Sequence, residues 1–235
     1  MRRHILPLLL AAALLAAGGC ALRAPAPPEP EEPAEIIQDT PEIPPEPADP
    51  APDAPEPGDF VRVRDYLPQV GVDLRYAGTD NFTGQVIYGF TDACLRYGTV
   101  EKLSRAQEAL EEQGFSLLIW DAFRPVEAQF RLWEVCPDPV YVADPETGFS
   151  SHSRGNTVDV TLTDLEGNDV EMPSGFDDFS SLADRDYSDA SPDAAANAAL
   201  LEDVMEECGF RPYSGEWWHF TDTDDYPVEE NFSPG

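Results

Sequence analysis

Two histidines and one aspartate have the residue types of a catalytic metal site. Of the 3 histidines in the 235-residue chain, His4 is close to the amino terminus, His152 lies in "SSHSRGNTVDV" and His219 lies in "EWWHF". Asp159 stands between two valines, where a lone carboxylate is costly unless it is paired or bound to a metal. Catalytic zinc sites take three protein ligands from His, Asp and Glu and keep a fourth position for water. These residues are therefore candidates for a mononuclear zinc site.

Each of these residues also has a simpler interpretation. A single histidine is more often a hydrogen-bonded structural residue, and Asp159 alone could be an ordinary ion-pair partner. The sequence lacks the HExxH motif found in many zinc proteases. Gly155 would let the chain turn so that His152 and Asp159 converge. Spacing alone leaves the metal site a hypothesis.

The chain around these residues is predicted to combine helices with strands. Apolar residues at helical spacing, with start and stop signals, predict helices over 99–114, 123–136 and 191–209. Apolar or alternating runs predict strands over 115–121, on both sides of a turn at 166–168, and over 210–213 and 216–220. Arg124 falls at the junction of a strand and a helix, where side chains commonly face a cleft. The mixture predicts an α+β fold in which helices pack on a mainly antiparallel sheet.

Glu216 can join His219 in one site only under a geometric condition. The two residues are separated by Trp217 and Trp218, so a regular strand would point them to opposite faces. Glu216 is therefore expected in the bend that enters the strand, which Gly215 permits. The two tryptophans are expected to pack and shield, because indole offers only a hydrogen-bond donor.

The amino-terminal end predicts export. Residues 1–20, "MRRHILPLLLAAALLAAGGC", have the basic start and short apolar run of a bacterial secretory signal. The last five residues of this segment, "AAGGC", are similar to a lipoprotein signal and predict lipidation of Cys20. Such signals usually have leucine three residues before the cysteine, where this sequence has Ala17. An ordinary signal with an incidental cysteine is the alternative. The mature protein is thus predicted to be an extracytoplasmic, membrane-anchored lipoprotein.

The rest of the chain is predicted to form a tether and one domain. Residues 21–58 are rich in proline and acid and lack aromatic residues, so they are predicted to form a disordered tether. Residues 59–235 have the length of a single compact domain. The net charge of −32 excludes nucleic acid and anionic lipid surfaces as partners, which leaves the lipid anchor as the predicted membrane contact.

Three cysteines remain once Cys20 is assigned to lipid. They show no CxxC or other metal-binding spacing. Cys208 is predicted to pack as a small apolar residue on a helix. Cys94 and Cys136 are then the one pair considered for a disulfide.

Several motifs resemble the D-alanyl-D-alanine dipeptidases of the VanX type, within the lysostaphin, D-Ala-D-Ala and hedgehog-like metallopeptidases. They occur in the family order and span most of the predicted domain: "DNFTG" (80–84), "LIWDAFRP" (118–125), "SSHSRG" (150–155), "DVTL" (159–162), "FDDF" (176–179) and "GFRPYSGEWWHF" (209–220). The resemblance implies the family's α+β fold and a zinc-dependent hydrolase of D-Ala-D-Ala in cell-wall metabolism.

The resemblance also implies roles for the residues introduced above. His152, Asp159 and His219 would bind one Zn²⁺ per chain, which lowers the pKa of its water toward roughly 7. Glu216 would act as the general base toward that water. Loss of this base or of the arginine would be needed for a non-catalytic, wall-binding zinc fold, and the sequence retains both.

Three further positions are assigned to the substrate by the same resemblance. Arg124 would stabilise the transition state, and Ser150 and Asp177 would line the substrate site, the latter near the substrate ammonium. The sequence departs from the family at Thr157, where alanine is common, and at 183–187, "ADRDY", which replaces two histidines. The expected substrate is a D,D-dipeptide, and a D,D- or L,D-carboxypeptidase acting on peptidoglycan stem peptides is the alternative.

Overall fold

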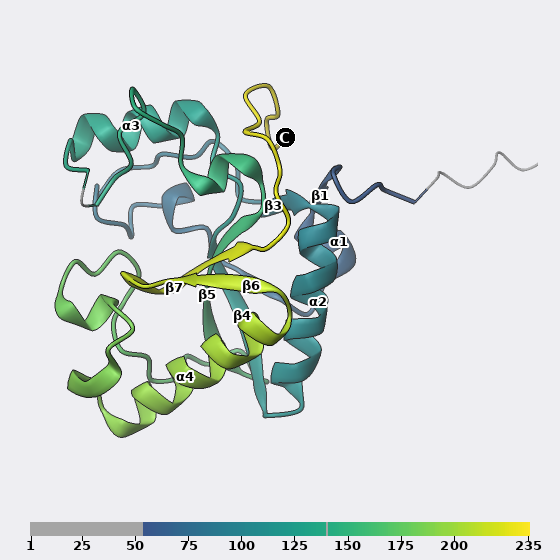
Figure 1. Cartoon of the computed structure of the whole chain (residues 1–235), viewed down its shortest axis with the longest axis vertical. Helices are drawn as coiled ribbons and strands as arrows, with labels where there is room; N and C mark the ends of the chain where they lie inside the picture. The colour runs from purple at the N-terminus through teal and green to yellow at the C-terminus, as the bar shows by residue number, and fades with distance from the viewer. Residues whose placement is uncertain (1–53, 140) are drawn as a thin grey trace, which may run out of the picture. The chain divides into compact units, whose positions relative to one another are not determined.

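A computed structural model describes residues 54–139 and 141–235 (Figure 1). The chain divides into two units, Met1–Pro50 and Ala51–Gly235, and the described residues belong to the second. The predicted signal, Cys20 and most of the tether lie outside the described residues, so those predictions stay predictions. None of the described helices is long and apolar enough to span a membrane.

A five-stranded sheet forms the centre of the described unit. Its order is β2-β4-β5-β7-β6, and only the β2–β4 pair is parallel. The strands are β2 (Gly71–Val72), β4 (Phe115–Asp121), β5 (Thr157–Asp164), β7 (Glu216–Asp222) and β6 (Phe210–Tyr213). A second, two-stranded sheet pairs β1 (Phe60–Arg62) with β3 (Cys94–Arg96). The mainly antiparallel sheet predicted from the sequence is confirmed.

The helices are α1 (Val63–Tyr66), α2 (Tyr97–Glu111), α3 (Val126–Val135) and α4 (Pro192–Glu207), with 3-10 helices η1 (Arg75–Ala77), η2 (Ser151–Arg154), η3 (Ser181–Ala183) and η4 (Tyr187–Asp189). Helices α2, α3 and α4 follow the three predicted segments with small shifts at their ends, whereas α1 and the 3-10 helices were not predicted. Ser191 caps α4 by accepting a hydrogen bond from the Ala194 N–H at 3.1 Å. Pro125 is the N-cap of α3, one residue earlier than the first helical turn predicted for it. Helices α2 and α4 contact each other and the sheet.

Alternation along β5 explains how the sequence directs Asp159 to the site. Val158, Val160 and Leu162 are almost wholly buried and belong to the hydrophobic core. Because successive side chains of a strand point to opposite faces, Asp159 and Thr161 face away from this core layer. Both are still buried, at 3% and 5% exposure, so the carboxylate of Asp159 lies in an enclosed polar environment.

The structure corrects one expectation and answers one question that the sequence left open. The second strand predicted after the 166–168 turn is reduced to an isolated bridge between Thr163 and Asp169, because the Asp164 carboxylate accepts hydrogen bonds from the Asn168 N–H and amide and closes a tight turn. The Cys94–Cys136 disulfide is absent, and both residues are free thiols. Cys94 is buried within β3, whereas Cys136 lies partly exposed at the end of α3.

Candidate metal centre and active site

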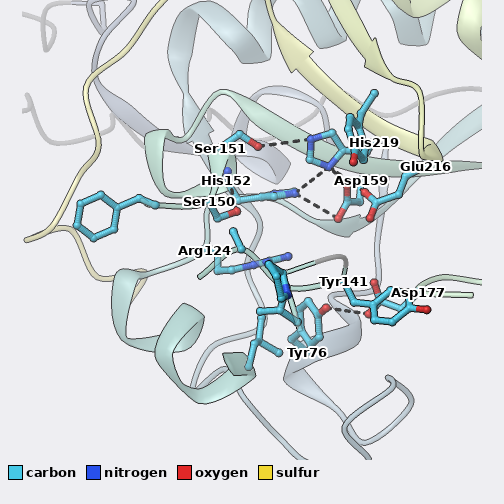
Figure 2. A pocket seen from close by; sticks show the side chains of 16 residues that line it. Tyr76, Arg124, Tyr141, Ser150, Ser151, His152, Asp159, Asp177, Glu216 and His219 are labelled. Carbon is cyan, nitrogen blue, oxygen red and sulfur yellow. Dashed lines mark hydrogen bonds and ion pairs between the residues drawn. The ribbon is translucent and has the colours of Figure 1, made fainter. Parts of the chain in front are cut away.

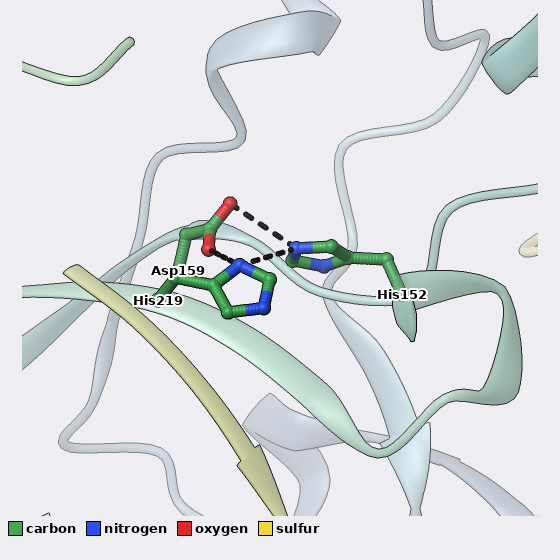
Figure 3. A group of neighbouring side chains, drawn as sticks. All are labelled: His152, Asp159 and His219. Carbon is green, nitrogen blue, oxygen red and sulfur yellow. Dashed lines mark hydrogen bonds and ion pairs between the residues drawn. The ribbon is translucent and has the colours of Figure 1, made fainter. Parts of the chain in front are cut away.

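His152, Asp159 and His219 converge on one point (Figure 3). His152 Nε2 lies 3.3 Å from Asp159 Oδ2, and His219 Nδ1 lies 3.0 Å from Asp159 Oδ1. The two imidazole nitrogens are 3.4 Å apart. Cross-strand pairing explains half of this arrangement, because Asp159 of β5 is directly opposite His219 of β7.

A short 3-10 helix brings His152 to the same point. The Ser150 side chain caps η2 by accepting a hydrogen bond from the His152 N–H at 3.3 Å. Gly155 ends η2 with φ 75°, a left-handed conformation that returns the chain into β5. His152 Nδ1 lies 2.8 Å from the Ala122 carbonyl oxygen, which can only accept. Nδ1 therefore carries the ring proton, and Nε2 offers its lone pair toward Asp159 and His219.

The donor atoms fit a small divalent cation. Asp159 Oδ1 is buried and lacks a hydrogen bond despite its short distance to His219 Nδ1. Burial raises the pKa of Asp159, but His152 and His219 outweigh it and hold that pKa well below its usual value, so the group is a carboxylate. Two imidazole nitrogens around an unsatisfied carboxylate oxygen form a set that suits zinc. His219 Nε2 lies 3.4 Å from the Ser151 hydroxyl, a partner that can orient the ring.

Glu216 lies beside the metal-binding group because β7 is irregular. Pro212 of β6 pairs with Phe220, whereas the next residue, Tyr213, pairs with Glu216. The extra β7 residues form a bulge, which places Glu216 Oε2 3.4 Å from His219 Nδ1. Glu216 was expected in a bend that enters the strand; it is instead the first residue of β7, and the bulge between Glu216 and Phe220 brings it to His219. Burial raises the pKa of Glu216, so this carboxylate holds a proton more readily than an exposed one.

Arg124 is held directly by Asp121 and Gln129, and Tyr88 holds Asp121 in turn; the sequence predicted no role for these three residues. Its Nε and Nη2 donate to Asp121 Oδ2 at 3.2 and 2.7 Å, and its Nη1 donates to Gln129 Oε1 at 3.2 Å. Tyr88 donates to the other Asp121 oxygen at 2.7 Å. Burial lowers the pKa of Arg124, but the groups around it, the Asp121 carboxylate foremost, together raise it by more than burial lowers it. The pKa therefore lies well above its usual value, and the guanidinium stays charged. Asp121 in "LIWDAFRP" was the available sequence signal, as a charge at the end of an apolar strand.

The metal-binding group, Glu216 and Arg124 line one pocket of about 310 Å³ (Figure 2). Ser150 and Asp177 line it too, as predicted. Asp177 adopts φ 53° and accepts a hydrogen bond from the Tyr76 hydroxyl at 2.7 Å. Burial raises the pKa of Asp177 to about 8. Figure 2 places Arg124 between the metal-binding group and the Tyr76–Asp177 pair.

Aromatic residues at the pocket were not identified from the sequence. Tyr76, Tyr141, Phe149 and Tyr213 line it, and the last three are about half exposed. The segments of Tyr76, Tyr141 and Phe149 carry no motif that distinguishes them from ordinary loop or strand residues, whereas Tyr213 lies within "GFRPYSGEWWHF" but was assigned no role. Thr157, a departure from the expected family pattern, is buried at the start of β5, and its hydroxyl lies 3.1 Å from that of Thr221.

Comparison with known proteins identifies the family. The family model described as D-ala-D-ala dipeptidase matches residues 57–234. The chain belongs to this family. It is 39% identical over 153 residues to the D-alanyl-D-alanine dipeptidase of Escherichia coli (strain K12), a match that covers 65% of this chain and 79% of the relative. The enzyme of the same name from Streptomyces coelicolor is 36% identical, covering 70% of this chain and 91% of the relative.

A third D-alanyl-D-alanine dipeptidase, from Enterococcus faecium, is 34% identical, and the match covers 66% of this chain and 87% of the relative. Among solved structures, a variant of the vancomycin resistance D,D-pentapeptidase VanY in complex with Zn(II) matches with a TM-score of 0.38 and 15% identity, covering 58% of this chain and 77% of that chain. Membership of the dipeptidase family makes this protein a metallopeptidase.

Proposed function

We propose that the protein hydrolyses D-Ala-D-Ala and closely related D,D-dipeptides with one zinc ion per chain. The observation that carries this proposal is the convergence of His152, Asp159 and His219 beside Glu216 in a pocket that also contains Arg124. The relatives named D-alanyl-D-alanine dipeptidase support the substrate class.

Zinc would be held by His152 Nε2, the Asp159 carboxylate and His219 Nδ1. When bound, it supplies Lewis acidity that makes water a nucleophile near neutral pH. Glu216 accepts the proton of the attacking water and then donates it to the leaving amine. Its position within 3.4 Å of His219 places it at the edge of the metal-binding group.

Arg124 is proposed to stabilise the negative charge that develops on the carbonyl oxygen of the scissile peptide. Its side chain is 11% exposed and fixed by the Asp121 carboxylate. A fixed guanidinium in a water-poor pocket stabilises such charge without reorganising during the reaction. The buried Asp121 therefore acts on the reaction through the orientation of Arg124.

Asp177 and Ser150 are proposed to bind the two ends of the substrate. Asp177 faces the pocket and is the acidic group suited to a substrate ammonium, as the family pattern implies. Ser150 is the N-cap of η2 and lines the same pocket. The pocket volume of about 310 Å³ is at the lower end of the range for small-ligand sites, which favours a dipeptide over a longer chain.

The alternative, a D,D- or L,D-carboxypeptidase of stem peptides, can use the same metal-binding residues. The deciding experiment compares D-Ala-D-Ala with a D-Ala-D-Ala-terminated pentapeptide, with zinc content measured on the same protein sample. A kcat/KM at least roughly tenfold higher for the dipeptide supports the proposal. A preference for the pentapeptide would make the protein a carboxypeptidase.

The amino-terminal signal and Cys20 support an extracytoplasmic location for this activity. An exported enzyme is separated from the cytoplasmic pool of D-Ala-D-Ala, so we propose a role in processing or salvaging wall-derived dipeptides. Fractionation after expression in a bacterial host tests this. An uncleaved cytoplasmic protein without lipid on Cys20 would contradict the location and favour a role in the cytoplasmic pool.

A further inference from the structure

Arg185 is a buried arginine within the segment 183–187, where the sequence departs from its family. Its side chain is 9% exposed and does not line the pocket. Its Nε donates to the Tyr213 carbonyl at 2.8 Å, and its Nη2 donates to the His219 carbonyl at 3.0 Å. One guanidinium therefore connects the main chain of β6 to the main chain of a predicted zinc ligand on β7.

The positions of these two carbonyls follow from the β6–β7 ladder. Phe210, Arg211 and Pro212 pair in turn with Asp222, Thr221 and Phe220. The Thr223 N–H donates to the Gly209 carbonyl at 3.0 Å, which fixes the alternation of hydrogen-bonded pairs. Since such pairs recur at every second residue, they fall at Gly209 with Thr223 and at Arg211 with Thr221.

The next hydrogen-bonded pair of this ladder would join Tyr213 to His219. The bulge removes it, because Tyr213 pairs with Glu216 instead. The carbonyls of Tyr213 and His219 are the two acceptors that this missing pair would have used. They are also the two main-chain acceptors of the Arg185 side chain.

The guanidinium is itself held from the opposite side. Its Nη1 forms an ion pair with Glu202 Oε2 of α4 at 3.1 Å, and that carboxylate accepts a hydrogen bond from the Tyr187 hydroxyl at 2.7 Å. The cationic group also lies 4.6 Å from the centre of the Phe220 ring. A planar fork with several fixed donors can satisfy this geometry, whereas a single ammonium cannot.

We propose that Arg185 is a positioning residue that replaces the missing β6–β7 hydrogen-bonded pair and so fixes His219 and Glu216 in the geometry that the metal site requires. The bulge brings Glu216 next to His219, and Arg185 stabilises the backbone opening that the bulge creates. The part of this inference that concerns zinc binding rests on the proposed function. The part that concerns the backbone of β6 and β7 does not, since the contacts of Arg185 exist whether or not zinc binds.

The test compares Arg185→Lys with a matched control, Arg211→Lys. Arg211 is an exposed arginine of β6 whose Nη2 lies 3.5 Å from the Asp222 carbonyl, away from the bulge. Arg185→Lys is expected to lower zinc affinity roughly tenfold or more, measured by chelator competition, and to alter the absorption spectrum of the Co²⁺-substituted protein. Arg211→Lys should change neither. Glu202→Gln, which keeps an acceptor for Arg185, should give a smaller change in the same direction.

A metal-free readout separates this inference from the proposed function. Hydrogen exchange of the apo protein should accelerate over 213–219 in Arg185→Lys and stay unchanged in Arg211→Lys. Unchanged exchange, zinc affinity and Co²⁺ spectrum would overturn the inference, as would losses that merely follow the unfolded fraction. If the wild-type protein neither bound zinc nor cleaved the dipeptide, the proposed function would fail, while the exchange data would still decide the role of Arg185.

Discussion

The two sides of the metal site are supported in different ways. The turn side, defined as η2 and Gly155, carries His152, which is 2% exposed. The hairpin side, defined as β6 and β7, carries Glu216 and His219, whose side chains are 30% and 15% exposed. The turn side is held by main-chain hydrogen bonds to neighbouring segments. The hairpin side contains a bulge whose two free carbonyls accept hydrogen bonds from Arg185, a residue outside the hairpin.

The turn side is surrounded by segments from both ends of the described chain. The Ser153 carbonyl accepts a hydrogen bond from the Glu229 N–H at 2.8 Å, and the Arg154 carbonyl accepts one from Arg96 Nε at 3.0 Å. The ring of Phe60 packs against Gly155 and stacks on Phe232 at 4.1 Å. Such contacts leave His152 little freedom to move.

The difference matches the roles proposed for the two sides. A metal ligand must keep its position, which burial and many contacts ensure. A proton carrier must reach first the water and then the leaving amine, so Glu216 is better placed on a side that is less enclosed. Substitutions on the turn side should therefore affect metal binding and stability most, whereas replacing Glu216 on the hairpin side should affect the rate and leave the zinc content unchanged.

The largest effect is expected from His152→Ala. It removes a ligand and leaves the buried Asp159 carboxylate without one of its two imidazole partners, which costs roughly 3 kcal/mol or more of stability. Zinc and activity should both be lost. His219→Ala should also lose zinc, with a smaller fall in Tm because this side chain is more exposed. Metal analysis and thermal unfolding measure both. Stoichiometric zinc in His152→Ala would show that the ligand set is wrong.

Glu216→Gln should separate catalysis from metal binding on the hairpin side. The amide keeps the shape of the side chain but cannot accept the proton, so kcat should fall roughly 10²- to 10⁴-fold. Zinc content should stay near that of the wild type. Steady-state kinetics and metal analysis on one preparation are the measurements. Full activity in Glu216→Gln would exclude it as the general base.

Arg124→Lys tests the group that links the turn side to the substrate. The Arg124 N–H donates to the His152 carbonyl at 3.3 Å, so its backbone belongs to the turn side while its side chain faces the pocket. A lysine cannot reproduce the fork held by Asp121, and kcat should fall roughly 10²-fold with zinc retained. An increase in KM with unchanged kcat would make Arg124 a binding residue only.

The two sides also differ in how well the sequence predicts them. The turn side was predictable, because a histidine, a glycine and an aspartate within one short stretch define a local turn and strand. On the hairpin side the need for a bend at Glu216 could be predicted. Its solution could not, since the bulge depends on pairing between β6 and β7 and on Arg185, which is remote in sequence.

The pocket residue Tyr76 shows the same limit. Tyr76 reaches Asp177 from a 3-10 helix far away in the sequence, and no local pattern indicates this contact. The sequence left the state of Cys94 and Cys136 open for a related reason. Counting cysteines gives the possible pairs, but the positions of β3 and the end of α3 decide whether the thiols meet.

Gly155→Ala measures how tightly the turn side is packed, with Gly167→Ala as its matched control. Both glycines have positive φ, 75° and 82°, so each alanine should lose roughly 1 kcal/mol of stability. A Cβ on Gly167 meets open space, whereas one on Gly155 would collide with the Phe60 ring. Gly155→Ala should therefore lose roughly 1 to 3 kcal/mol more and weaken zinc binding. Equal losses of stability would show that the turn side is more adaptable than its contacts indicate.

The smallest effect concerns Asp177, which belongs to neither side and faces the pocket from the segment between β5 and α4. Burial raises its pKa from 3.8 to about 8 in the folded protein. Between these two pH values the folded state keeps a proton that the unfolded state has lost, so this carboxyl lowers the stability progressively as pH rises. Asp177→Asn should remove this component of the decline in Tm with pH.

Tyr76→Phe should extend the decline to higher pH, because the Tyr76 hydroxyl lowers the pKa of Asp177 by hydrogen bonding. Thermal unfolding of the three metal-free proteins across this range is the measurement. Parallel Tm profiles for wild type and Asp177→Asn would show that Asp177 is already ionised near neutral pH, ready to bind an ammonium without first losing a proton.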